Sequence, residues 1–75
     1  MKILDLHRLR YEEAEREIIH FIEDCWGSGE DEAKVITGHS SQMRKLVVDI
    51  VKEYDAKTAV GGAVGIDDTF VMIYF

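Results

Sequence analysis

Two periodicities of apolar residues alternate along this chain, and they constrain its fold more than any other feature. Between residues 11 and 26, apolar side chains recur every three or four positions, which predicts an amphipathic helix. A second helix of this kind follows Ser40 or Ser41, either of which can cap its amino end. Short apolar segments typical of strands surround the two helices. These segments are residues 2–7, 33–38, 57–60 and 69–75. The predicted element order is therefore βαβαββ.

The length of the chain limits how these elements pack. We expect residues 1–75 to form a single domain, which buries only about 60% of its unfolded surface. A right-handed strand–helix–strand crossover makes the first two strands parallel, with their carboxyl ends at one edge of the sheet. Two helices cover both faces of four strands poorly. We therefore predict an α/β two-layer sandwich, with a mixed four-stranded sheet carrying both helices on one face.

The last strand has a further implication for partners. The segment "TFVMIYF" (residues 69–75) is apolar on both faces, whereas a strand with one solvated face alternates apolar and polar residues. We therefore expect another chain to cover part of the open sheet face. A homodimer and a larger protein partner both satisfy this expectation.

Cysteine content and apolar run lengths restrict the class of protein. The single cysteine, Cys25, excludes an intrachain disulfide and is typical of a reducing compartment. It lies in the apolar stripe of the first helix, which favours a buried packing thiol over a nucleophile. The apolar runs are too short to span a membrane, and the first residues lack the pattern of a secretory signal. We expect a cytoplasmic protein with no membrane contact.

Charge is segregated along the chain. The net charge of −6 argues against strong nonspecific binding of polyanions. Nine acidic residues lie between Glu12 and Glu32, against the single basic residue Arg16. Basic residues gather instead at Arg8 and Arg10 and again at Arg44 and Lys45. This separation leaves room for a local anion site on an acidic protein.

Polar residues end the first two predicted strands. Asp5 and His7 are two positions apart, so strand alternation places them on one face. The segment "TGHSS" (residues 37–41) ends the second strand and begins the second helix, where backbone N–H groups and the helix dipole suit a phosphate. The predicted phosphate-binding residues are Arg8, Arg10, Thr37, Gly38, Ser40, Ser41 and Arg44. On spacing alone, ordinary helix capping is the preferred explanation of the turn, and a simple strand-end hydrogen bond is the preferred explanation of the Asp5–His7 pair.

Three stretches resemble one known family. "LDLHRLRYEEAEREIIHFI" is similar to the opening of the Smr (small MutS-related) domain, "VITGHSSQMRKLV" to its glycine turn, and "GGAVG" to its later glycine segment. The resemblance implies a compact α/β domain, similar in fold to the carboxyl-terminal domain of a translation initiation factor, that nicks DNA or cleaves RNA. The family's Asp-x-His element carries over to Asp5 and His7. Arg8 and Ser40 replace two of its glycines, and Thr37 replaces its turn histidine, for which His39 is the candidate substitute.

The leading hypothesis is an Smr-like endonuclease that acts on nucleic acid, with RNA favoured over DNA. His7 would move a proton, since the ordinary pKa of histidine is about 6.5, and Asp5 would orient it or hold a metal-bound water. Mg²⁺ is the candidate metal, and Asp67 with Asp68 is a second place for a divalent cation. The alternatives are a noncatalytic module that binds nucleic acid or a protein, and a small adaptor with no nucleic-acid role.

Overall fold

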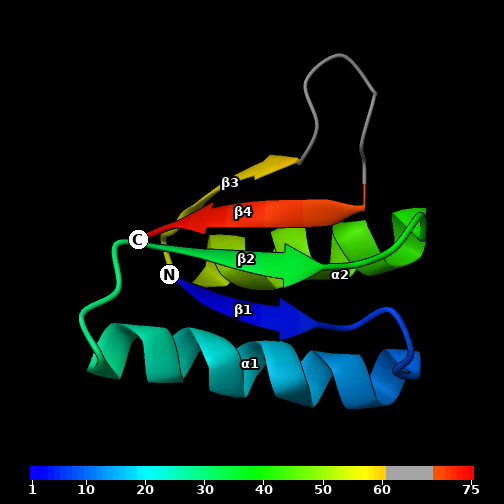
Figure 1. Cartoon of the computed structure of the whole chain (residues 1–75), viewed down its shortest axis with the longest axis horizontal. Coiled ribbons are helices and arrows are strands. Elements are labelled where there is room, and N and C mark those ends of the chain that lie inside the picture. The colour runs from blue at the N-terminus through cyan, green and yellow to red at the C-terminus, as the bar shows by residue number, and fades with distance from the viewer. Residues whose placement is uncertain (61–68) are drawn as a thin grey trace.

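The computed structural model of the chain describes residues 1–60 and 69–75 and contains the predicted elements in the predicted order (Figure 1). The elements are β1 (Lys2–Asp5), α1 (Tyr11–Gly27), β2 (Glu32–Ile36), α2 (Ser41–Glu53), β3 (Lys57–Val60) and β4 (Phe70–Tyr74). The predicted glycine-rich turn region, with Asp67 and Asp68, lies outside the described residues. No helix in the described ranges has the length and apolar character needed to cross a membrane.

The four strands form one mixed sheet in the order β1-β2-β4-β3. β1 and β2 are parallel, and β4 is antiparallel to both of its neighbours, β2 and β3. Leu4 lies opposite Val35, which in turn lies opposite Val71, so these three side chains share one face. The predicted parallel pair at the start and antiparallel strand at the end are both confirmed.

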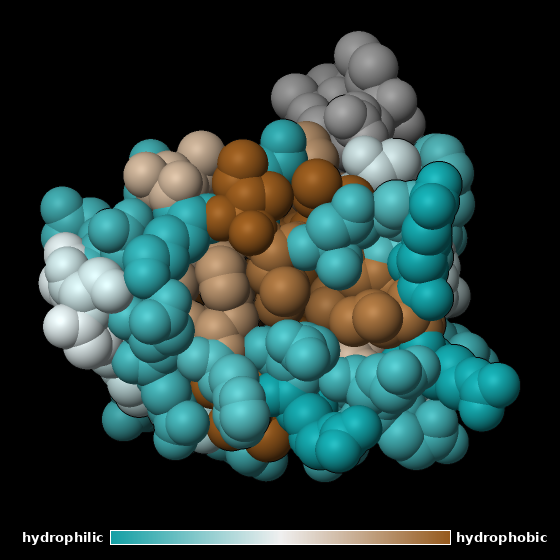
Figure 2. All heavy atoms as spheres, turned by 60° about the horizontal axis from the view of Figure 1, so that its bottom comes forward, coloured by the Kyte–Doolittle hydropathy of each residue, from teal (hydrophilic) through white to brown (hydrophobic). Residues whose placement is uncertain are grey.

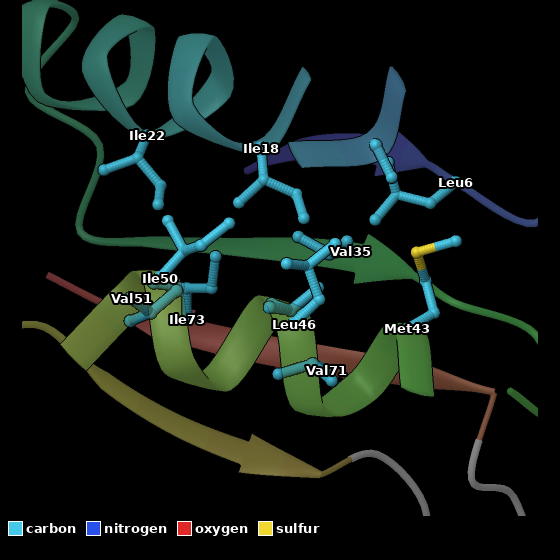
Figure 3. Packing of buried hydrophobic residues seen from close by; sticks show 12 residues of the cluster. Leu6, Ile18, Ile22, Val35, Met43, Leu46, Ile50, Val51, Val71 and Ile73 are labelled. Carbon is cyan, nitrogen blue, oxygen red and sulfur yellow. The ribbon is translucent and has the colours of Figure 1, made fainter. Parts of the chain in front are cut away.

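The two helices contact each other on one face of the sheet, and this layer interface holds the core. Alternate residues of the strands point toward the helices because side chains alternate along a strand. Figure 3 shows Ile18 and Ile22 of α1 facing Leu46 and Ile50 of α2, with strand residues such as Val35 between them. The buried core residues are Leu6, Ala14, Ile18, Ile22, Cys25, Ala33, Val35, Met43, Leu46, Val47, Ile50, Val51, Val71 and Ile73. The predicted two-layer sandwich is confirmed.

The helix ends show which residues begin them. Ser40 is the N-cap of α2, because its hydroxyl oxygen accepts a hydrogen bond from the Met43 N–H at 3.1 Å. Ser41 is then the first helical residue, which decides between the two serines. α1 begins after Arg10, whose backbone N–H donates to the Glu13 carboxylate at 3.1 Å. That carboxylate also lies where the positive end of the helix dipole stabilises it.

Cys25 is fully buried in α1, as the sequence predicts. Burial raises the pKa of the Cys25 thiol, because the charged thiolate is disfavoured away from water. The thiol is thus a packing group. Beside it in sequence, Trp26 packs against the rings of Tyr54 and Phe75, with centroid separations of 5.1 and 6.0 Å.

Candidate functional site

β1 and β2 both end at the side of the molecule where α1 and α2 begin, so the two polar motifs lie at one edge of the sheet (Figure 1). β1 ends at Asp5, two residues earlier than predicted. The Asp5 carboxylate accepts a hydrogen bond from the His7 backbone N–H at 3.0 Å, and this turn-forming bond takes the chain out of the strand. The position of His7 is therefore set by a local turn and not by the alternation of side chains along the strand.

The same Asp5 oxygen accepts a hydrogen bond from Nδ1 of the His7 ring. An ionised carboxylate can only accept, so Nδ1 carries the proton and Nε2 of the neutral ring carries the lone pair. Nε–H of Arg8 donates to that Nε2 at 3.2 Å. The imidazole is thereby oriented from both sides, with its basic nitrogen beside a guanidinium.

The Asp5–His7 pair lies at the surface. The side chains of His7 and Asp5 are 43% and 49% exposed, so a ligand in solvent can reach both. The His7 side-chain hydrogen bond, followed by that of the His7 backbone, holds the pKa of Asp5 below its ordinary value. Asp5 is therefore ionised at neutral pH. Its contribution to stability is present above the unfolded-state pKa and is lost as the pH falls through the lower folded-state pKa.

We expect His7→Ala to raise the pKa of Asp5 toward its ordinary value. The substitution removes the side-chain donor, the larger cause of the shift, and keeps the backbone N–H at position 7. A ¹³C NMR titration of the Asp5 carboxyl carbon measures the change. Arg16→Ala, on the exposed surface of α1, is the control that should leave this titration unaltered. An Asp5 titration that His7→Ala does not move would contradict the pairing.

The second motif forms the turn between β2 and α2. β2 ends at Ile36 because the N–H groups of Thr37 and Gly38 both turn to the Thr69 carbonyl oxygen, at 2.7 and 3.0 Å. Thr37 is buried, and its hydroxyl lies within donating distance of the Gly38 and Thr69 carbonyl oxygens, at 2.9 and 3.2 Å. The hydroxyl and N–H of Thr37 and the N–H of Gly38 are thus already used within the fold. An anion at this turn would meet amides further along, and those of Ser41 and Gln42, in the first turn of α2, have no partner within the helix.

The two motifs approach each other at Gly38. Its φ of +65° lies in the left-handed region that favours glycine. A Cβ atom at this position would lie 3.4 Å from Cβ of His7. The turn that begins α2 therefore lies beside the Asp5–His7 turn, as expected from two neighbouring parallel strands.

The remaining predicted residues surround these two turns. His39 is exposed in the turn after Gly38, Ser41 is exposed at the amino end of α2, and Arg44 is partly exposed in its first turn. Arg10 is exposed at the amino end of α1. Within residues 1–60 and 69–75, no three His, Cys, Asp or Glu side chains gather closely enough to hold a metal ion.

Two features of this edge were not predicted. One is the Arg8 bond to His7, whose only sequence signal is that the two residues are adjacent. The other is Phe70, which lies in the same cross-strand row as Asp5 and Ile36 and carries the Lys34 ammonium over its ring. The sequence shows that both faces of "TFVMIYF" are apolar, but the strand register is needed to place Phe70 in that row.

One protein-family model matches this chain. The model of the Smr domain family matches residues 4–65, a range that includes Asp5, His7 and the 37–41 turn. No curated protein and no solved structure gives a significant match. Membership of the family implies a role related to nucleic acids. Since the match covers most of the chain, this protein belongs to the Smr domain family.

Proposed function

We propose that this domain is an endonuclease that cleaves RNA at the edge formed by the Asp5–His7 turn and the Gly38 turn. The observation that carries the proposal is the oriented Asp5–His7 pair, half exposed and beside the glycine turn of an adjacent helix. A base held by a carboxylate beside a helix amino end suits reaction at a phosphodiester. Family membership supports nucleic acid as the substrate.

In the proposed reaction, Nε2 of His7 takes the proton from a ribose 2′-hydroxyl. The 2′-oxygen attacks the adjacent phosphorus, and the bond from phosphorus to the 5′-oxygen breaks. The products are a 2′,3′-cyclic phosphate and a 5′-hydroxyl, and His39 is the proposed donor of the proton to the leaving oxygen. Asp5 stabilises the imidazolium that forms on His7. Arg8, which donates to Nε2 in the structure, would exchange that bond for one to the phosphate.

The proposed phosphate contacts are the amides of Ser41 and Gln42, the side chain of Arg44, and the basic residues Arg8 and Arg10. We expect Arg44→Ala to weaken RNA binding and to flatten its salt dependence by about one unit of log–log slope, because one phosphate contact is lost. Fluorescence anisotropy at several salt concentrations measures both quantities. Arg16→Ala removes the same charge from the acidic surface of α1 and should change the affinity far less. If the two variants behave alike, the phosphate does not bind at α2.

The experiment that tests the function is a cleavage assay on single-stranded and structured RNA, with nicking of duplex DNA as a second substrate. Cleavage of RNA to a cyclic phosphate end supports the proposal, and intact RNA under all conditions overturns it. Reactions with Mg²⁺ and with a chelator separate the two roles of Asp5. Activity in chelator means that Asp5 orients His7, and activity restored only by Mg²⁺ means that it holds a metal-bound water.

A second candidate function is a noncatalytic module that binds nucleic acid, a protein or a second copy of this chain. The observation that favours it is Thr37, which stands where the family has its turn histidine and whose hydroxyl bonds within the fold. Such a module would bind RNA and leave it intact, or would bind only protein. The same cleavage and binding measurements therefore distinguish it from the nuclease.

A further inference from the structure

The sheet face opposite the helices is largely apolar. Its outward side chains include Ile3, Ile36, Phe70, Met72 and Tyr74, which alternate with the buried residues of the same strands. Ile3 is 57% exposed and Tyr74 is 41% exposed. Figure 2, which brings the β1 and α1 side toward the viewer, shows hydrophobic surface open to solvent between hydrophilic residues. A face of this kind is typical of a binding surface.

One aromatic ring on this face is paired with a cation. The Lys34 Nζ lies 4.2 Å from the centroid of the Phe70 ring, on the neighbouring strand β4. Phe70 is partly exposed, and both side chains point away from the core. An aromatic ring stacks on any nucleobase, and an adjacent ammonium pairs with the phosphate that the base carries.

The strand register aligns this ring with the candidate active site. Asp5 lies opposite Ile36, and Ile36 lies opposite Phe70, so the three form one row across β1, β2 and β4. Adjacent strands are separated by roughly 4.8 Å, which places Phe70 about 10 Å from Asp5 along the row. A nucleotide next to the one that reacts at His7 can span this distance.

Charge indicates which occupant suits the face. The helix layer carries six exposed acidic residues on α1, so a polyanion is repelled from that side: Glu12, Glu13, Glu15, Glu17, Glu23 and Asp24. The open face instead presents Lys34 at its centre, next to Phe70, and its acidic residue on β2, Glu32, lies further from the candidate site, opposite Tyr74. A second copy laid on this face would remove both the Lys34 ammonium and the Glu32 carboxylate from water among apolar side chains, which is costly unless each charge meets a well-placed partner anion or cation. A single-stranded RNA stacked on Phe70 brings a phosphate to Lys34 and leaves Glu32 in water.

We infer that Phe70 and Lys34 form a stacking subsite for single-stranded RNA, in which Phe70 binds the nucleobase next to the scissile phosphate and Lys34 binds the phosphate of that nucleotide. The inference rests on the proposed function, because it uses His7 as the point of reaction. It assigns the open face a role in holding substrate and extends the site from the edge of the sheet onto its surface.

The test measures binding without cleavage. A short 2′-O-methyl oligoribonucleotide lacks the attacking hydroxyl, and its fluorescence anisotropy gives the Kd. Phe70→Leu should raise the Kd by about 5- to 100-fold, the range expected for loss of one stacked base. Phe70→Tyr, which keeps the ring, should bind like the parent protein. Met72→Leu changes a neighbouring residue on the same face and is the matched control. Lys34→Gln should reduce the salt slope by roughly 0.7.

An abasic position in the oligonucleotide identifies stacking directly. The parent protein should lose affinity when the base that meets Phe70 is removed, and Phe70→Leu should lose nothing further. If Phe70→Leu binds like the parent and keeps the abasic penalty, the subsite is wrong, while cleavage that depends on His7 still supports the proposed function. A parent protein that binds no RNA would contradict both the stacking subsite and the proposed function. A parent dimer that becomes monomeric in Phe70→Leu, seen by sedimentation, shows the face to be an interface between copies and overturns the inference.

Discussion

Replacing His7 with Ala, or Asp5 with Asn, should lower RNA cleavage by about 100-fold or more, the usual contribution of a general acid or base. His7→Ala removes the proton acceptor, and Asp5→Asn removes the negative charge that stabilises the imidazolium. Neither change should alter the Tm much, because both side chains are about half exposed and leave no buried polar group unpaired. Initial rates of cleavage and thermal melts followed by circular dichroism measure the two effects on the same samples.

His20→Ala is the matched control, since His20 is exposed on α1 and lies on the surface of the helix layer. This variant should keep both activity and Tm. A structural pair would behave differently from a catalytic one. In a domain of this size, each 1 kcal/mol lost lowers the Tm by roughly 4–8 °C. A lower Tm in His7→Ala, together with a parent protein that does not cleave RNA, would make the pair structural and favour the binding module.

The second large effect concerns stability. Ile18→Ala should destabilise the fold by about 2–5 kcal/mol, through lost burial and the cavity that remains. Ile18 is 0% exposed and lies on the core face of α1. In Figure 3 its side chain lies between that of Ile22, also on α1, and that of Leu6, which follows β1. Domains of this kind are stable by only about 5–15 kcal/mol. The variant should therefore unfold at a much lower urea concentration than the parent.

Ile3→Ala is the control of identical chemistry. Ile3 is 57% exposed on the open sheet face, and its truncation should change the free energy of unfolding by less than about 0.5 kcal/mol. Urea unfolding curves of the two variants, recorded side by side, give both values. An Ile3→Ala loss as large as that of Ile18→Ala would mean that the open face is buried in solution against another chain.

Much of the fold follows from local patterns in the sequence. The three- and four-residue spacing of Ala14, Ile18, Ile22 and Cys25 predicts α1, and all four side chains are buried on its inner face. The interval 57–60 is the strand β3 as predicted. The predicted ends of β1 and β2 were less accurate. Side-chain and backbone hydrogen bonds at Asp5 and Gly38 end these strands, and a hydropathy pattern contains no information on such bonds.

The candidate site was predicted as a set of residues but not as an arrangement. The sequence places Asp5, His7 and the 37–41 turn at one edge through the rule that parallel strands end together. It leaves the choice between Ser40 and Ser41 open, because either serine can cap a helix. In the structure the Met43 N–H donates to the Ser40 hydroxyl, so Ser40 is the cap. The sequence assigns Thr37 and Gly38 to an anion, whereas three of their donors bond to backbone carbonyls, since the chain that enters β4 at Thr69 comes within reach.

The sequence by itself determined the order of the elements, the buried faces of both helices and the family, because periodicity, turn residues and short motifs are local properties. Only the tertiary structure decided that Gly38 lies beside His7 and that Phe70 shares a row with Asp5. Both depend on the strand order β1-β2-β4-β3, in which the last strand pairs beside the second. That pairing joins residues far apart in the chain through backbone hydrogen bonds, which every residue type except proline can form, so no side-chain pattern specifies it.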